Sequence, residues 1–308
     1  MSEEKKKIYE LVIVGAGPAA LSAAIYTTRE DIETILLEKG VPGGLAAVTD
    51  WVDNYPGFPK GISGLDLADN LRQQAERFGA DIRPAEVMSI EDMGDHKKLA
   101  TTDGDVLAKA VLIATGTDYK KIGVPGEKEY YARGVHYCAT CDGAFYRDKK
   151  IVVVGGGNSA VQEALFLTRF ATHIDLLVRS TIKASDVLIH ELEKNEKITV
   201  HLGTTTDEIV GENNMVTKVV GTHEGKKVEF VTDGVFVFVG LKPNTQFLRE
   251  GPIKLDDIGF VVAEHGLQTS VKGVFAAGDV RAGATMQIAS AVGEGATAAL
   301  RIREYLES

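Results

Sequence analysis

The chain has 308 residues, 44% of them hydrophobic, and a formal net charge of -10. This length suggests about two domains, and the composition, with 33 glycines, fits an α/β protein with many tight turns. The negative charge argues against a nucleic-acid partner, whose phosphates would require a basic face. A charged start that runs into a strand, with no apolar signal segment and no long apolar span, predicts a cytoplasmic protein without a membrane anchor.

The first recognisable unit spans residues 9–39, which read as strand, glycine turn, helix and strand. A continuous apolar run, typical of a buried parallel strand, leads into G-x-G-x-x-A at Gly15, Gly17 and Ala20. The first glycine makes the tight turn, the second lets a pyrophosphate approach the backbone, and the small third residue lets the helix pack on the strand. This unit therefore predicts a nucleotide site.

The only two cysteines of the chain, Cys138 and Cys141, follow in the segment Cys-Ala-Thr-Cys-Asp-Gly. This spacing lets one disulfide open and close. A zinc site would need four ligands, and His136 alone cannot complete one. A structural staple across so short a loop would constrain the unfolded chain very little. The pattern favours redox chemistry and no metal.

Residues 150–179 repeat the strand, turn, helix and strand, with Gly155, Gly157 and Ala160 in the turn, 140 residues after the first copy. A single turn of this type is a weak indication, because small residues occupy many strand-to-helix turns. Two copies, each inside a complete βαβ unit, predict two nucleotide-binding domains.

The residue that ends the second strand differs between the copies. In the first it is Glu38, where a carboxylate accepts from the hydroxyls of an adenosine ribose, although a solvated strand-end charge is the alternative. In the second it is Val178, followed by Arg179. The second copy therefore lacks the ribose carboxylate and offers a cation, which favours a 2′-phosphate.

The tail from about Thr245 has no nucleotide turn of its own, but carries Asp279 after an apolar strand and then an Ala-rich helix. We expect it to fold back onto the first domain. The predicted fold is α/β, with two Rossmann-like three-layer nucleotide-binding domains, the second inserted into the first.

With these motifs the chain resembles the low-molecular-weight thioredoxin reductases nearly end to end. The segments that carry the resemblance lie at 15–20, 42–44, 54–58, 114–116, 138–143, 155–160 and 277–279. The resemblance implies a homodimer with FAD that passes electrons from a pyridine nucleotide through flavin to Cys138–Cys141 and then to thioredoxin or a thioredoxin-like protein. It implies an FAD-binding domain of residues 1–117 and 245–308, and an inserted pyridine-nucleotide domain, 118–244, that carries the disulfide.

The resemblance also implies roles for individual residues. Cys138 and Cys141 would be the redox pair and Asp142 the acid that shuttles its proton; capping of the short helix after Cys141 is the alternative role for Asp142. The implied FAD site comprises Gly15, Gly17, Pro18, Ala20, Glu38, Lys39, Gly43, Gly44, Leu45, Asn54, Val87, Gly116, Asp279, Met286, Gln287 and Ile288. The implied second nucleotide site comprises Gly155, Gly157, Asn158, Ser159, Ala160, Arg179 and Lys183.

The chain departs from the family pattern at several of these positions. Leu45 replaces a glutamine, Met286 replaces an arginine, and residues 178–180 read Val-Arg-Ser where the family has His-Arg-Arg, with Lys183 as the nearest further cation. The electron donor is therefore open between NADP(H), NADH, ferredoxin and deazaflavin. A flavin-dependent dithiol oxidase and a non-enzymatic redox-sensing flavoprotein are further alternatives. His136, where the family commonly has a small residue, is interpreted as a solvated loop histidine.

Overall fold

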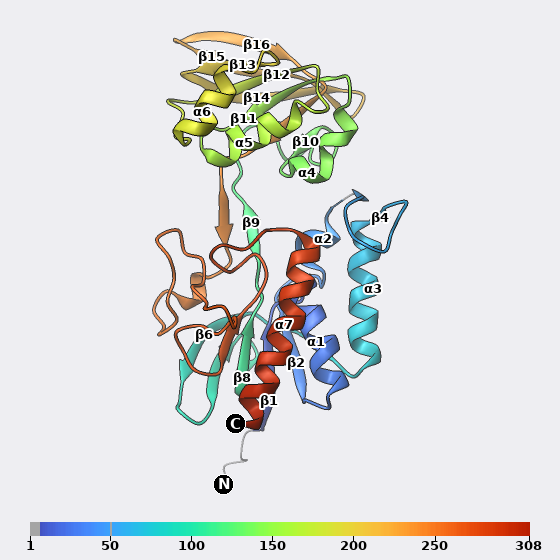
Figure 1. The fold of residues 1–308 in the computed structure, drawn as a ribbon, viewed down its shortest axis with the longest axis vertical. Helices are drawn as coiled ribbons and strands as arrows, with labels where there is room; N and C mark the ends of the chain where they lie inside the picture. Colours follow the sequence, from blue (N-terminus) through green and yellow to red (C-terminus); the bar gives the residue numbers. More distant parts are fainter. Residues whose placement is uncertain (1–6, 50) are drawn as a thin grey trace. The chain divides into compact units, whose positions relative to one another are not determined.

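The structure is a computed structural model that describes residues 7–49 and 51–308. The chain forms two compact units, Met1–Asp118 with Lys242–Ser308 (the first unit) and Tyr119–Leu241 (the inserted unit). The chain leaves the first unit once and returns once, as the colours of Figure 1 show. The two crossing segments, β9 (Thr117–Tyr119) and β18 (Leu241–Pro243), pair with each other in a two-stranded sheet.

The first unit is built on a seven-stranded sheet with the order β5-β2-β1-β8-β7-β6, in which β19 also pairs with β8. The strands that run parallel are β1 (Ile8–Val14), β2 (Thr34–Glu38), β5 (Asp81–Pro84), β8 (Gly104–Ile113) and β19 (Val274–Ala276). The strands β6 (Val87–Asp92) and β7 (Lys97–Thr101) extend it in an antiparallel direction. The helices are α1 (Pro18–Arg29), α2 (Gly44–Ala47), α3 (Gly64–Arg77) and α7 (Ile288–Glu307).

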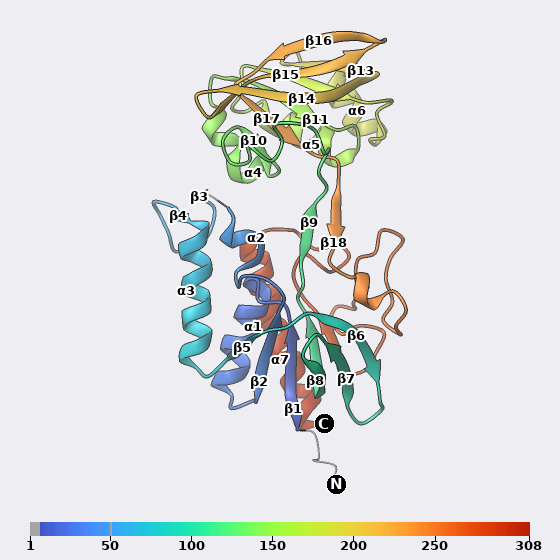
Figure 2. The same cartoon turned by 180° about the vertical axis from the view of Figure 1, so that it is seen from behind.

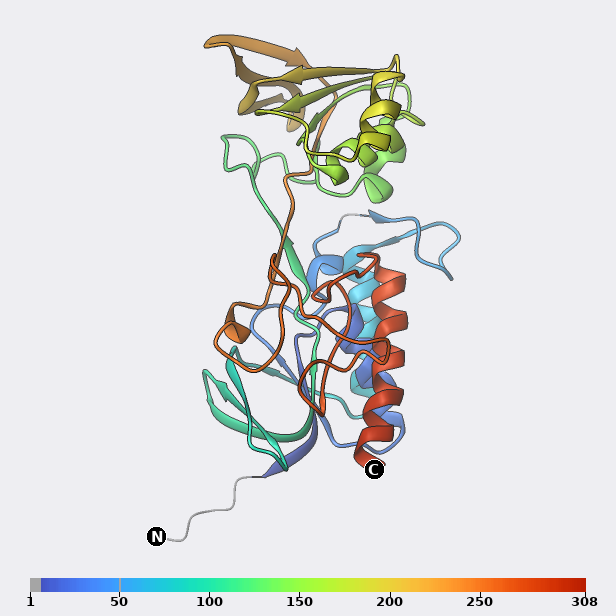
Figure 3. The same cartoon turned by 60° about the vertical axis from the view of Figure 1, so that its left-hand side comes forward.

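The two faces of this sheet bury different cores. Along β1, Leu11 and Ile13 face the core shared with α1, α3 and α7, whereas Val12 and Val14 face the core on the opposite side. This division follows from the alternation of side chains along a strand. Figure 3 shows α7 in red on the side of the sheet away from the β6–β7 hairpin. Gly295 lets α7 approach α1 closely, because a Cβ there would lie 2.2 Å from the carbonyl oxygen of Ala19.

The inserted unit contains a five-stranded parallel sheet between two layers. Its strand order is β10 (Val135–His136), β17 (Gly234–Val237), β11 (Lys150–Val154), β12 (His173–Val178) and β13 (Ile198–Leu202). One face is covered by α5 (Asn158–Leu167) and α6 (Asp186–Glu193). The other face packs on an antiparallel sheet of β14 (Thr204–Glu212), β15 (Met215–His223) and β16 (Lys226–Val231), visible in Figure 2.

The inserted unit repeats the first one. The order β13-β12-β11-β17 matches β5-β2-β1-β8, with the glycine turn after the equivalent strand, β11 or β1. The predicted fold class, two Rossmann-like three-layer units with the second inserted into the first, is confirmed. No helix among residues 7–49 and 51–308 is long and apolar enough to cross a membrane.

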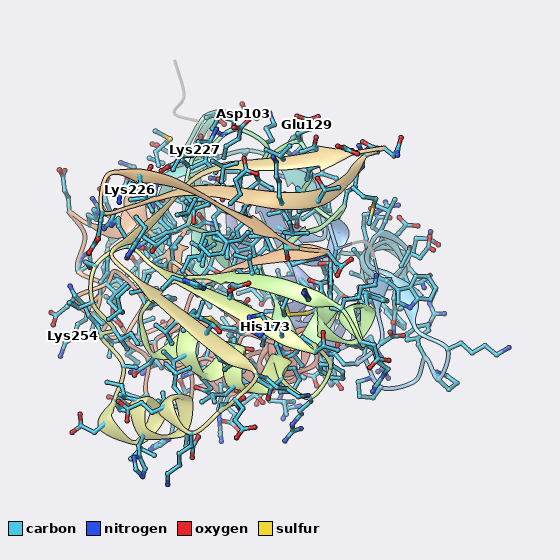
Figure 4. The ribbon with its side chains drawn as sticks, turned by 90° about the horizontal axis from the view of Figure 1, so that it is seen from above. Asp103, Glu129, His173, Lys226, Lys227 and Lys254 are labelled. Carbon is cyan, nitrogen blue, oxygen red and sulfur yellow. A yellow bond between two sulfur atoms is a disulfide. The ribbon has the colours of Figure 1, made fainter. Side chains whose placement is uncertain are left out.

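The outer edge of the antiparallel sheet carries charge. Strand β16 is an edge strand, and it begins with the exposed residues Lys226 and Lys227, labelled in Figure 4. Lysines on an edge strand oppose pairing with another sheet. This edge is therefore protected from edge-to-edge aggregation.

Candidate functional site

The glycine turn of the first unit leaves open space at the start of α1. Gly15 has a φ of 103°, and a Cβ there would lie 2.6 Å from the carbonyl oxygen of Ala114, so this position requires glycine. Gly17, the N-cap residue of α1, has a φ of -79°, and a Cβ there would meet nothing within 4 Å. The free N–H groups and the positive dipole end of α1 border this space, which suits a phosphate.

Glu38 connects this turn to an adjoining cavity. Its carboxylate accepts hydrogen bonds from the backbone N–H groups of Ala16 and Gly40, both at 2.8 Å. Glu38 also lines a cavity of about 310 Å³, together with Lys39 and Val87. Glu38 is thus held against the glycine turn instead of projecting alone into solvent, and its remaining lone pairs are available to a ligand in the cavity.

A second turn approaches the same place from the other side. Gly43, with a φ of 115°, donates its N–H to the carbonyl oxygen of Ala16 at 2.7 Å. A Cβ on Gly44 would lie 3.4 Å from the Cα of Gly17. The Pro-Gly-Gly turn therefore lies directly against the glycine turn, and Leu45 follows it in α2.

Two predicted site residues of the first unit, Asn54 and Gln287, are distant in the sequence but contact each other. The side-chain amide of Asn54 donates to Oε1 of Gln287 at 3.1 Å, although the two are 233 positions apart. Gln287 is the N-cap residue of α7, whose first residue is Ile288. Met286 has a φ of 57°, a left-handed conformation that a non-glycine residue adopts only when its surroundings impose it.

Asp279 is a half-buried acid of the first unit. Its side chain makes no hydrogen bond within residues 7–49 and 51–308, whereas the neighbouring Glu294 is paired with Arg281. Burial, and then the charge of Glu294, raise the pKa of Asp279 to about 6. A half-buried carboxylate without a protein partner has lone pairs available to a ligand hydroxyl.

We expect Asp279→Asn to stabilise the ligand-free protein at pH 7.5 and not at pH 4. The native protein binds more protons at Asp279 than the unfolded chain between its ordinary pKa of 3.8 and about 6, so stability falls as the pH rises through this window. At 1.36 kcal/mol per unit, the removable penalty at pH 7.5 is up to about 3 kcal/mol. Urea unfolding at both pH values measures it, with the exposed Asp257→Asn as control. Equal effects at both pH values would contradict this account.

The Cys pair, Cys138 and Cys141, forms a disulfide with its Cα atoms 5.3 Å apart. Cys138 follows β10 and is the N-cap residue of the one-turn helix α4 (Ala139–Asp142). Its Sγ accepts the backbone N–H of Cys141 at 3.2 Å. An N–H donor stabilises negative charge on a sulfur, so this contact favours a thiolate at Cys138 if it persists in the reduced pair.

His136 is not a solvated loop residue, and that interpretation was wrong. Its side chain is only 11% exposed, with Nδ1 3.2 Å from Oδ2 of Asp142 and Nε2 2.7 Å from the hydroxyl of Tyr146. The imidazole ring stacks on Phe236 with centroids 5.2 Å apart. The side chains around the ring come from other elements, so no local pattern at His136 indicated its burial.

The alternative role of Asp142 as a helix cap is also wrong. Cys138 caps α4, and Asp142 makes no side-chain capping bond to the following 3-10 helix η1 (Gly143–Tyr146). Its carboxylate contacts His136 instead. The carboxylate of Asp142 is therefore not used to cap a helix.

The glycine turn of the inserted unit is partly covered by its own chain. A Cβ on Gly155 would lie 2.4 Å from the carbonyl oxygen of Phe238, whereas the space at Gly157 is open. The backbone N–H of Lys183 donates to the carbonyl oxygen of Gly156 at 2.6 Å. The backbone N–H of Ser185 donates to Oδ1 of Asn158 at 2.8 Å. The structure thus brings Lys183 to the turn, with Ser159 and Ala160 in the first turn of α5.

The residues at the end of β12 and directly after it differ in exposure. Val178 is 2% exposed and lies so close to Gly156 that a Cβ there would be 2.7 Å from its Cγ1. Arg179 and Ser180 are exposed at the end of the strand. Only Arg179 and Lys183 therefore offer cations near this turn among the predicted site residues.

Residues 9–295 match the model of the pyridine nucleotide-disulphide oxidoreductase family. The chain is 42% identical, over 100% of its length and 97% of the relative's, to a thioredoxin reductase of Bacillus subtilis. The chain belongs to the thioredoxin reductases of this family. The crystal structure of thioredoxin reductase from Streptococcus pyogenes has a TM-score of 0.92 at 39% identity, covering 97% of this chain and 98% of that one. The thioredoxin reductase of Giardia duodenalis has a TM-score of 0.93 at 32% identity, covering 98% and 100%.

Members of this family of thioredoxin reductases are flavin-dependent oxidoreductases that act on a sulfur group, and they use FAD together with a reduced donor. The predicted family and enzyme class are confirmed. In the described part of the chain, no group of three or more His, Cys, Asp or Glu side chains is arranged to hold a metal ion.

Proposed function

We propose that this thioredoxin reductase passes two electrons from a reduced donor, by way of FAD, to the Cys138–Cys141 disulfide and then to thioredoxin or a thioredoxin-like protein. The observation that carries the proposal is the disulfide formed by the only two cysteines, in a chain that matches curated thioredoxin reductases over its full length. We further propose that the protein is a homodimer, which light scattering of the purified protein tests.

The residues of the first unit fit FAD. The open space at Gly17 and the start of α1 would take the pyrophosphate, and Glu38 the adenosine ribose. The cavity beside Val87 would take the adenine, and the unpartnered Asp279 a ribityl hydroxyl. The Gly43–Gly44 turn and the Asn54–Gln287 pair would border the flavin ring. When bound, FAD supplies a carrier for two electrons between the donor and the disulfide.

The Cys pair carries the exchange with thioredoxin. The thiolate of Cys138 attacks one sulfur of the thioredoxin disulfide, forming a mixed disulfide and releasing one thioredoxin thiolate. The sulfur of Cys141 then attacks that of Cys138, which re-forms the Cys138–Cys141 disulfide and releases the second thiolate. Thioredoxin gains two electrons and takes up two protons, and the Cys pair is oxidised by two electrons.

We also propose that NADPH is a poor donor by the standards of the family. Val178 is packed into the core of the inserted unit and Ser180 carries no charge, so two of the family's three side chains at 178–180 offer nothing to a 2′-phosphate. One hydrogen bond to a charged group contributes about 1.5–3 kcal/mol, and about 1.4 kcal/mol is tenfold in affinity. No acidic residue stands at 178 to bind a free 2′-hydroxyl, so NADH gains little in exchange.

Ser180→Arg is therefore expected to lower the NADPH concentration needed for half-maximal flavin bleaching by about tenfold. Ser180 is exposed, so the added side chain needs no repacking, unlike a histidine at the buried position 178. Anaerobic stopped-flow absorbance measures the bleaching. Val231→Arg adds the same charge at a site that is 76% exposed on β16, and should change nothing. Fast bleaching of the unaltered protein by low-micromolar NADPH would overturn the donor proposal.

Anaerobic assays with thioredoxin and a panel of donors separate the remaining alternatives. NADPH, NADH, reduced ferredoxin and reduced deazaflavin are supplied in turn, and new thioredoxin thiols are counted. Turnover with any one of them supports the reductase and names its donor. Oxygen consumption with small dithiols, without thioredoxin turnover, would indicate the dithiol oxidase, and no turnover in either assay would indicate a sensor.

A further inference from the structure

The inserted unit contains a linked set of polar side chains next to the Cys pair, centred on His136. The imidazole comes from β10, Asp142 from the end of α4 and Tyr146 from the end of η1. The ring is held on its flat face by Phe236 of β17 and contacts Asp142 at Nδ1 and Tyr146 at Nε2. Both nitrogens of a largely buried ring are therefore engaged, and the ring has one orientation.

Nδ1 of the ring lies 3.2 Å from Oδ2 of Asp142, and the hydrogen bond of the ring is the one at Nε2. The hydroxyl of Tyr146 lies 2.7 Å from Nε2 and donates to it in the tautomer that carries its proton at Nδ1. Burial raises the pKa of Tyr146, so this hydroxyl keeps its proton at physiological pH. A Tyr146 hydroxyl that donates to Nε2 favours the tautomer with its N–H on the side of Asp142.

The other charged and titratable groups around this set do not replace that contact. Burial, and then the charge of Asp142, raise the pKa of Tyr131. Burial raises the pKa of Tyr146, and the charges of Asp142 and Asp233 add to this effect. The Lys149 ammonium lies 5.4 Å from the Tyr146 ring centroid. His136 is the side chain that the structure places 3.2 Å from the carboxylate of Asp142.

We propose that His136 is a positioning residue that holds the Asp142 carboxylate in place for proton exchange with the Cys pair. This rests on the proposed function, in which the thiol of the reduced pair gives its proton to Asp142. The electron pair of that sulfur then forms the bond to the thioredoxin sulfur, and a thioredoxin thiolate leaves. His136 itself contacts neither sulfur in this scheme and acts through Asp142.

The test is a double-mutant cycle on protein reduced with excess dithiol and then desalted. The rate constant for reaction of its Cys pair with a soluble aromatic disulfide is followed by the released coloured thiolate, a measurement that needs neither donor nor thioredoxin. We expect a loss of about tenfold for His136→Phe, which keeps a ring against Phe236, and a similar loss for Asp142→Asn. The double variant should be no slower than Asp142→Asn alone, because both changes remove the same contact.

Two further variants test positioning against mere packing. His136→Asn places an amide N–H near the position of Nδ1, and should recover the rate to within about threefold of the unaltered protein. With thioredoxin as substrate, His136→Phe should lower kcat and leave KM unchanged. Additive losses in the cycle, no recovery in His136→Asn, or an unchanged rate in His136→Phe at an unchanged Tm would overturn the proposal. The double-mutant cycle uses an aromatic disulfide and does not depend on thioredoxin. Failure of the unaltered protein to reduce thioredoxin would therefore overturn the proposed function and not the outcome of the cycle.

Discussion

Gly17→Val is expected to yield a folded protein that lacks FAD. Gly17 has an ordinary extended backbone, and a Cβ there meets nothing within 4 Å, so valine introduces no clash in the protein itself. Its methyl groups would occupy the space assigned to the pyrophosphate, in front of the N–H groups of α1. The loss of two or more such charge-assisted contacts should weaken binding at least about a hundredfold. The measurement is flavin absorbance per chain after denaturation.

The second copy of the motif provides a matched control. Gly157 has the same backbone conformation and the same open surroundings, so Gly157→Val should fold, remain yellow and keep one FAD per chain. It should lose only bleaching by NADPH or NADH. A yellow Gly17→Val protein with unchanged FAD content would show that the pyrophosphate lies elsewhere. Unchanged bleaching of Gly157→Val by either nucleotide would show that the inserted unit does not bind it at this turn.

Cys138→Ser and Cys141→Ser should each abolish turnover of thioredoxin, because a single thiol can neither store two electrons nor resolve a mixed disulfide. Bleaching of the flavin by the effective donor should be unaffected, because the residues proposed to hold FAD all lie in the first unit, away from both substitutions in the chain. In the proposed function Cys138 is the cysteine that attacks thioredoxin and Cys141 the one that resolves the mixed disulfide. Steady-state thiol release and stopped-flow absorbance measure the two half-reactions.

Thr140→Ser is the matched control for this pair, since Thr140 lies exposed between the two cysteines. It should retain turnover. Full thioredoxin turnover in either cysteine variant would show that electrons bypass the Cys pair.

The parts of the fold that follow from local pattern could be predicted from the sequence. The apolar run of β1 followed by Gly15 and Gly17 specifies a buried strand, a tight turn and a helix, and the same logic holds for Gly155 and Gly157. Because these signals are repeated, two units follow from them, and the tail from about Thr245, which has no glycine turn of its own, indicates the insertion of the second unit into the first. The cysteine spacing likewise indicates the disulfide, since three positions is within bridging range in a helical turn.

The contacts that depend on packing between distant segments could not be predicted. Nothing local to His136 shows that Tyr146 and Phe236 enclose its ring, because that requires β10 to pair with β17. The burial of Val178 against Gly156 depends in the same way on how the segment after β12 returns over the glycine turn. The imidazole of His136, interpreted from the sequence as solvated, is packed in the structure.

The most direct test of the proposed function is a donor-independent transfer of electrons to thioredoxin. The purified yellow protein is reduced anaerobically with a measured amount of dithionite, mixed with oxidised thioredoxin, and the thiols formed on thioredoxin are counted. The account predicts two new thioredoxin thiols for each pair of electrons that leaves the reduced protein. It predicts no new thioredoxin thiols with Cys138→Ser or Cys141→Ser. Reduced protein that leaves the thioredoxin disulfide intact would contradict it.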